Sequence, residues 1–317
     1  MKKKAAVIDM GTNTFHLLLV QMGDNQFEIL YKEKIAVRIG EGGINQNVLL
    51  PNAQKRALHT LTHFQNLIKG EKIDQVFTFA TSAVRNAKNA NDFTDKILQL
   101  TGFKVNIIDG EREAELIYKG IRLSSSLDQN TSLMMDIGGG SVEFIIGNEE
   151  TIFWKKSFEI GGQRMLDRFH YHDPILEEEV DKLYSYLESE LTSLFNAIKK
   201  YSPTRLIGAS GTFDTLTDMY LASLQLERSR DIQSHFLPIQ NFQSIADKLI
   251  RLNKQERLKI PGMIPMRVDM IVVASCLIQY ILKYVETPTL ICSTYSLKEG
   301  VIAELMEKVV SGVNISV

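Results

Sequence analysis

Two segments of the chain, residues 7–19 and 134–146, follow one pattern: an apolar run, an aspartate, a glycine-centred turn and a second apolar run. The turns are Gly11-Thr12-Asn13, after Asp9, and Gly138-Gly139-Gly140-Ser141, after Asp136. This pattern indicates a β-hairpin whose turn lets backbone N–H groups approach an anion without interference from a Cβ atom, beside a carboxylate able to hold a cation. The repetition predicts a duplicated domain, with two phosphate-binding loops facing each other across a cleft.

The organisation of the chain supports the duplication. Strands are expected at 5–9, 15–21 and 27–37, followed by alternating helices and strands up to a helix at 111–123. A polar linker at 124–130 precedes Leu133, where the strand–turn–strand pattern restarts. The second half is expected to contain a long helix at 176–200, a strand at 205–208 and a last helix at 296–310. This order predicts an α/β fold with mixed sheets, in which the last helix packs back on the first half.

Length and charge limit the function. A chain of 317 residues predicts two domains, each large enough for its own core. The formal net charge of −2 gives no overall field to attract nucleic acid or an anionic membrane, so neither is an expected partner. A polyanion must therefore be bound by local arginines, backbone amides or a metal ion. The apolar run at 270–282 is too short to span a bilayer, and the N-terminus is not a signal peptide, so a cytoplasmic protein is expected.

Several residues have the chemistry of a phosphate site. Three consecutive glycines at 138–140 favour close approach of the backbone to a ligand. Asp136 and Glu143 offer two oxygen ligands that suit Mg²⁺, although Glu143 also fits a solvent-facing strand position. Arg85 follows Thr81 and Ser82 at an expected helix start, which is either an anion site or a solvated surface arginine. Gly11-Thr12-Asn13 alone is equally compatible with a plain hairpin turn.

Five motifs in order carry a family resemblance. Residues 9–16, 81–87, 109–120, 136–143 and 208–212 resemble the successive motifs of the exopolyphosphatase and guanosine pentaphosphate phosphohydrolase (Ppx/GppA) family, of the actin, sugar-kinase and Hsp70 superfamily. The resemblance implies two ribonuclease-H-like domains with a cleft between them, as in the short members without extra C-terminal domains. The first domain is expected at 1–124, with a C-terminal helix at about 300–317, and the second at 125–299.

The resemblance also implies roles. Glu113 is expected to be the general base that orients the attacking water, and Asp136, Glu143 and Asp9 are expected to hold Mg²⁺. The expected phosphate-binding residues are Gly11, Thr12, Asn13, Arg85, Gly138, Gly139, Gly140, Ser141, Ser210, Gly211 and Thr212. Two departures from the family pattern are Arg112, where members often have a glutamate, and Lys298, where an arginine is usual. Arg267 and Asp269 are interpreted as mainly structural.

The predicted activity is hydrolysis of a terminal phosphoanhydride with Mg²⁺, either of inorganic polyphosphate or of guanosine pentaphosphate. Both substrates present the same anhydride, so the sequence does not choose between them. A kinase of the same superfamily and a non-catalytic sensor of guanosine alarmones are the alternatives. The sequence also does not decide whether the chain forms the homodimer that is common in the family.

Overall fold

The computed structural model describes residues 3–23, 26–229, 231–287 and 289–310, so the predicted C-terminal helix beyond 310 lies outside the described residues. The chain divides into two compact units. Unit 1 comprises residues 1–120 and 297–317, and unit 2 comprises residues 121–296. The predicted domains, 1–124 with about 300–317 and 125–299, differ from these bounds by a few residues. Within the described residues no helix has the length and apolarity needed to cross a bilayer.

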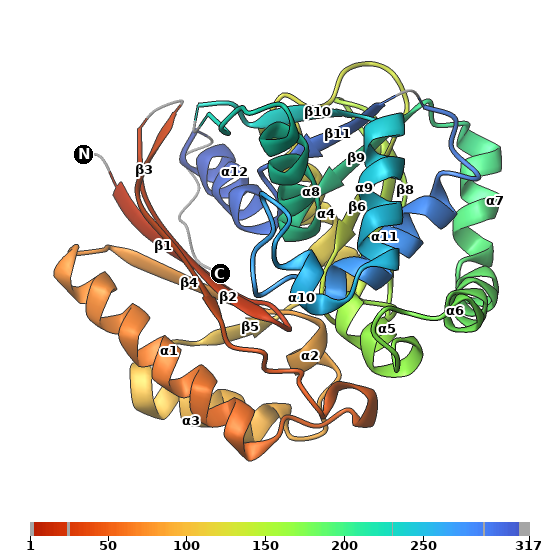
Figure 1. The fold of residues 1–317 in the computed structure, drawn as a ribbon. Helices are drawn as coiled ribbons and strands as arrows, with labels where there is room; N and C mark the ends of the chain where they lie inside the picture. The colour runs from red at the N-terminus through yellow and green to blue at the C-terminus, as the bar shows by residue number, and fades with distance from the viewer. Residues whose placement is uncertain (1–2, 24–25, 230, 288, 311–317) are drawn as a thin grey trace. The chain divides into compact units, whose positions relative to one another are not determined.

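Unit 1 is built on a five-stranded mixed sheet in the order β3-β2-β1-β4-β5 (Figure 1). β1 pairs antiparallel with β2 and parallel with β4. Helices α1 and α3 cover one face, where Ile8, Leu17 and Phe64 belong to one apolar core. The elements are β1 Lys3–Met10, β2 Thr14–Met22, β3 Phe27–Ala36, the 3₁₀ helix Ile44–Gln46, α1 Pro51–Gly70, β4 Gln75–Ala80, α2 Ser82–Arg85, α3 Ala90–Thr101, β5 Val105–Ile107, α4 Gly110–Leu123 and α12 Leu297–Val310.

Unit 2 repeats this plan in a six-stranded mixed sheet, β10-β11-β9-β6-β7-β8 (Figure 1). β6, β7 and β8 form an antiparallel meander like β1, β2 and β3, and β6 pairs parallel with β9. The elements are β6 Ser132–Ile137, β7 Val142–Gly147, β8 Ile152–Phe158, α5 Gly162–Phe169, α6 Glu177–Glu190, α7 Thr192–Tyr201, β9 Arg205–Ala209, α8 Ser210–Ser223, β10 Ser234–Pro238, α9 Ile239–Arg251, α10 Lys254–Arg257, α11 Met270–Ile281 and β11 Thr289–Ser293. The predicted fold class of two α/β domains with mixed sheets is confirmed.

The expected single helix at 176–200 is wrong. The segment forms α6 and α7, which are separated at Leu191. The Thr192 hydroxyl lies 3.3 Å from the carbonyl oxygens of both Glu188 and Ser189. Such bonding of a hydroxyl to the preceding turn competes with the regular helix and bends it. Apolar spacing continues through the break, so the periodicity alone does not reveal it.

Helix α12 returns to unit 1, as the sequence predicts, and packs on α4 at very short range. A Cβ atom on Gly300 would lie 1.8 Å from the carbonyl oxygen of Leu116, so only glycine allows this approach. Beside it, Arg112 donates to both carboxylate oxygens of Glu304, and Lys119 Nζ lies 3.0 Å from Glu304 Oε1. Burial alone would raise the pKa of Glu304, but the hydrogen bonds from Arg112 and Lys119 lower it below its ordinary value.

Arg112, a departure from the family pattern, is therefore expected to contribute to stability. Because Arg112 bridges Glu304 with two donors in a partly buried network, Arg112→Ala should lower the free energy of unfolding by about 1–2 kcal/mol. Urea denaturation at neutral pH measures this change. Arg122→Ala, at an exposed position of the same helix, is the control and should change stability by less than about 0.5 kcal/mol. Equal losses in the two variants would contradict the assignment.

Candidate functional site

The glycine turn of unit 1 is closed by its own hydrogen bond and is also bound by backbone N–H groups of the segment at 38–40. Gly11 N–H donates to the Thr14 carbonyl at 3.1 Å, and Thr12 and Asn13 are almost completely buried. The Thr12 carbonyl accepts a hydrogen bond from Gly40 N–H at 3.1 Å, and the Asn13 carbonyl accepts one from Arg38 N–H at 2.8 Å. The turn is thus a fixed part of the structure rather than a loose surface loop.

Asp9 lies near the end of β1. It is half-buried, stands opposite His16 of β2, and is the register partner of Phe79 in β4. The strand therefore ends with a carboxylate next to the Gly11 turn, as the sequence predicts. Asp9 belongs to unit 1, whereas the other two predicted metal ligands, Asp136 and Glu143, belong to unit 2.

Arg85 and Glu113, which lie far apart in the sequence, form a buried ion pair in unit 1. Arg85 Nη1 lies 2.7 Å from Glu113 Oε2 and 3.2 Å from the Ile108 carbonyl oxygen. The two side chains are only 14% and 9% exposed, so solvent screens the pair weakly. Helix α2 has only four residues, and the Thr81 side chain does not cap it. The Arg85 guanidinium, rather than the start of this short helix, is therefore the group here that is suited to an anion. Glu113 lies in the first turn of α4.

Unit 2 contains the other two predicted metal ligands, Asp136 and Glu143. They are direct cross-strand partners on β6 and β7, and both are buried. Neighbours that face each other directly in an antiparallel pair lie on the same side of the sheet. The Ser157 hydroxyl donates to Glu143 Oε1 at 2.7 Å, and the hydroxyls of Ser210 and Ser296 donate to Asp136 Oδ2.

This pair fits a Mg²⁺ ion. Two neighbouring carboxylates in a buried position repel each other, and a divalent cation offsets that repulsion. No group of three metal-binding side chains is present among the described residues. That is compatible with Mg²⁺, which commonly takes one or two carboxylates and completes its octahedron with water and substrate phosphates.

The second glycine turn, Gly138 to Ser141, connects these two strands. A Cβ atom on Gly138 would lie 2.9 Å from the Ser141 carbonyl oxygen, so the turn is tight. Ser141 is 2% exposed. The turn therefore lies immediately beside Asp136 and Glu143, and it presents a backbone without side chains at three successive positions.

The start of α8 lies next to a buried cation, Arg267, for which the sequence predicts a mainly structural role. Ser210, the first residue of α8, has a φ of +70°, which is rare for a residue with a side chain and typical of strained functional sites. A Cβ atom on Gly211 would lie 2.2 Å from Arg267 Nη2, so the missing side chain makes room for this guanidinium. Thr212 follows and is buried.

Arg267 is 8% exposed, and its Nε has no hydrogen-bond acceptor among the described residues. Burial lowers the pKa of Arg267, although the nearby charges of Asp214 and Asp136 favour the protonated form. A buried guanidinium beside a helix N-terminus suits an anionic ligand. In the sequence Arg267 lies outside the five motifs, and it is interpreted there as mainly structural.

The model of the Ppx/GppA phosphatase family matches residues 18–309. The chain belongs to this family. The exopolyphosphatase of Cytophaga hutchinsonii has a solved structure that is 43% identical, with a TM-score of 0.94, and the match covers 99% of this chain and 100% of that chain. A Ppx/GppA family member from Aquifex aeolicus is 24% identical, with a TM-score of 0.82 over the whole of both chains, and shows the same fold.

Two curated relatives are longer than this chain. The bifunctional 3-dehydroquinate synthase/phosphatase of Fusobacterium nucleatum is 30% identical over 314 residues, which cover 95% of this chain and 46% of that protein. The guanosine-5'-triphosphate,3'-diphosphate pyrophosphatase of Pseudoalteromonas atlantica is 31% identical over 218 residues, covering 68% of this chain and 43% of that protein. The chain therefore spans less than half the length of these relatives.

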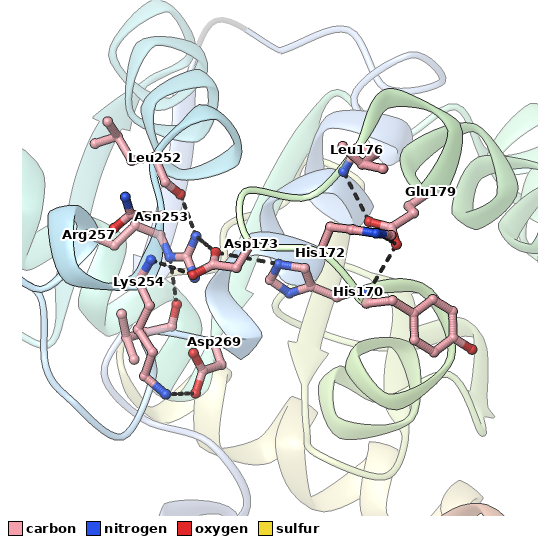
Figure 2. Close-up of polar contacts among 12 residues, drawn as sticks. His170, His172, Asp173, Leu176, Glu179, Leu252, Asn253, Lys254, Arg257 and Asp269 are labelled. Atoms are coloured by element: carbon pink, nitrogen blue, oxygen red, sulfur yellow. Dashed lines mark hydrogen bonds and ion pairs between the residues drawn. The ribbon is translucent and has the colours of Figure 1, made fainter.

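In this Ppx/GppA chain a fully buried arginine supports the segment that carries Arg267 (Figure 2). Arg257 Nη1 donates to Asp173 Oδ1 at 2.7 Å and to the Leu252 carbonyl at 2.5 Å, and its Nε donates to the Val268 carbonyl at 3.0 Å. Asp173 Oδ2 also accepts a hydrogen bond from the backbone N–H of Lys254 at 2.6 Å. The loop after α5 and the residue next to Arg267 are thus joined through one guanidinium.

His170 lies in the same network and gives unit 2 a pH-dependent element (Figure 2). Its side chain is 4% exposed, and its Nε2 lies 3.8 Å from Asp173 Oδ1. Burial and then the charge of Arg257 lower the pKa of His170 below its ordinary value of 6.5, against the opposite effects of Asp173, Glu179 and Asp269. The folded state therefore binds this proton less readily than the unfolded state does.

The sign of the pH effect follows from that difference. Above pH 6.5 His170 is neutral in both states and its contribution to stability is fully present, whereas below pH 6.5 the unfolded state takes up the proton first and stability falls. His170→Gln should therefore show a smaller loss of unfolding free energy between pH 7.5 and 5.5 than the wild-type protein does. Urea denaturation across this range measures both slopes, and parallel slopes would contradict the prediction.

Proposed function

We propose that the chain is a Mg²⁺-dependent phosphoanhydride hydrolase that releases terminal phosphate from inorganic polyphosphate. The observation that carries the proposal is the buried Glu113–Arg85 pair, because a guanidinium at 2.7 Å gives the carboxylate a fixed orientation. In the proposed reaction Glu113 accepts a hydrogen bond from water and takes its proton as the water oxygen attacks the terminal phosphorus. The bridging P–O bond breaks, which leaves inorganic phosphate and a chain shortened by one unit.

The remaining groups bind and neutralise the substrate. The backbone N–H groups of the Gly11 and Gly138 turns, together with the start of α8, suit phosphoryl oxygens. The buried Arg267 supplies a positive charge at the start of α8, and its low exposure strengthens the attraction between that charge and an anionic ligand. Asp136 and Glu143, with Asp9 as a further ligand of unit 1, would hold Mg²⁺. The bound metal would neutralise charge that develops on the phosphoryl oxygens.

Polyphosphate is the first choice of substrate because the similarity to the Cytophaga exopolyphosphatase extends over both whole chains. Guanosine pentaphosphate is the second candidate. The Pseudoalteromonas relative, whose name states that substrate, favours it, but the match covers only part of that protein. Both candidates end in the same anhydride, so the groups named above serve either one. We propose that the protein acts in the cytoplasm.

Substitution of the proposed base tests this function. With Mg²⁺ present, wild-type protein should release phosphate from polyphosphate or guanosine pentaphosphate, and Glu113→Gln should lower kcat by about 10²-fold or more, because the amide cannot accept a proton. Phosphate release is measured separately with polyphosphate, guanosine pentaphosphate and ATP. Glu111→Gln makes the same change at an exposed position of the same helix turn and should keep wild-type activity.

The outcomes separate the alternatives. Phosphate release that survives in Glu113→Gln would overturn the mechanism. Binding of guanosine pentaphosphate without any phosphate release would favour a sensor. Formation of ADP from ATP only in the presence of a second acceptor would favour a kinase.

A further inference from the structure

The carbonyl side of the Gly138 turn is fully occupied by the start of helix α5. Gly162 N–H donates to the Gly138 carbonyl at 2.8 Å, Gln163 N–H donates to the Gly139 carbonyl at 2.8 Å, and Gly161 N–H donates to the Gly140 carbonyl at 3.2 Å. The first N–H groups of a helix have no partner within the helix. Here three successive donors at the start of α5 bind three successive acceptors of the turn.

Arg164 completes this contact. Its side chain is 11% exposed, its Nε donates to the Gly140 carbonyl at 2.8 Å, and its Nη2 lies 3.1 Å from Glu159 Oε2. The Gly140 carbonyl therefore accepts from both Gly161 and Arg164. Because the bond comes from a charged and nearly buried donor, it is stronger than an ordinary backbone hydrogen bond.

The backbones of the Gly138 turn and of the start of α5 are also in close van der Waals contact. A Cβ atom on Gly161 would lie 2.4 Å from the carbonyl carbons of Gly139 and Gly140. The helix start therefore reaches the turn only because position 161 has no side chain. Hydrogen bonds and close packing together fix the turn from one side.

Fixing these carbonyls determines where the amides point. In a trans peptide unit the C=O and the following N–H point in opposite directions, so three oriented carbonyls at 138–140 orient the N–H groups of Gly139, Gly140 and Ser141 to the opposite side. None of these three N–H groups donates to a backbone carbonyl in the turn and loop contacts of the described chain. They are therefore a pre-oriented set of donors next to Asp136 and Glu143.

We propose that Arg164 is a positioning residue that sets the affinity of the Gly138 turn for phosphate, through its bond to the Gly140 carbonyl. Arg164 acts on the substrate only through the turn. The proposal rests on the proposed function, since it assigns phosphate groups to the amides of that turn. Neither the residues of the family motifs nor the Glu113 mechanism includes Arg164.

The first test is a comparison of two arginines of α5. Arg164→Gln should raise the KM for polyphosphate about tenfold and change kcat by less than about threefold, because the turn amides contribute binding shared by the ground and transition states. Arg164→Lys, which keeps a charged donor, should recover most of this loss. Arg168→Gln removes an arginine one turn later, which contacts the rings of Phe169 and Tyr186 instead, and should leave KM unchanged. A kcat and KM equal to wild type in Arg164→Gln would overturn the proposal.

Glu159→Gln provides a variant with little risk to folding, since Glu159 is 42% exposed. It weakens the support of Arg164 without touching the turn, and it should raise KM by about twofold to threefold. Thermal unfolding of each variant identifies any that is globally destabilised. If Arg164→Gln does not fold, an unchanged KM in Glu159→Gln would overturn the proposal.

A binding measurement separates this proposal from the proposed function. Calorimetric titration with tripolyphosphate and Mg²⁺, in the Glu113→Gln background, should show about tenfold weaker binding when Arg164→Gln is added. If wild-type protein releases phosphate but Glu113→Gln and the double variant Glu113→Gln, Arg164→Gln bind tripolyphosphate equally, only the role of Arg164 fails. If wild-type protein releases no phosphate from any substrate, the proposed function fails, and the difference in tripolyphosphate affinity still decides the role of Arg164: a difference supports it, and equal or absent binding overturns it.

Discussion

In each unit the candidate site residues depend on hydrogen bonds to the carbonyl side of a glycine turn. In unit 1, Gly40 and Arg38 donate to the carbonyls of Thr12 and Asn13. In unit 2, Gly161, Gly162 and Gln163 donate to the carbonyls of Gly138 to Gly140. Each supporting segment has a glycine at the point of closest approach. A Cβ atom on Gly40 would lie 2.6 Å from Thr12 Cγ2, and a Cβ atom on Gly161 would lie 2.4 Å from the carbonyl carbon of Gly139. The duplication thus extends to the contacts that hold each turn in place.

The two units have diverged in the charged groups beside these equivalent turns. Unit 1 carries the Arg85–Glu113 pair, and unit 2 carries Asp136, Glu143 and Arg267. Arg112 precedes Glu113 directly on α4. It is directed to Glu304 on α12, so its charge stabilises the packing of two helices. The substitution therefore changes the scaffold of unit 1 and leaves the Glu113–Arg85 pair intact.

Much of the fold follows from the sequence because strands and helix starts have local causes. The aspartate–glycine hairpins, and Pro51 at the start of α1, depend on residues within a few positions. The break at Leu191 depends on a hydroxyl that bonds backward, which apolar periodicity does not register. The Gly161-Gly162 pair is typical of a turn and does not by itself predict helix α5. In the structure Gly161 makes close contact with the Gly138 turn, about 20 residues earlier in the chain.

The predicted site residues share one property: each belongs to a motif whose local chemistry is visible. Arg164 and Arg267 lie outside the five motifs, and their contacts with Gly140 and Gly211 are tertiary. They are also compatible with the polyanionic substrate that we propose, in a chain whose formal net charge is −2. A positive surface would attract polyanions of every kind, whereas arginines that are about nine-tenths buried act strongly only within a few ångströms. In the proposed function, burial of these cations beside glycine turns therefore favours local binding of phosphate without a positive surface that attracts polyanions in general.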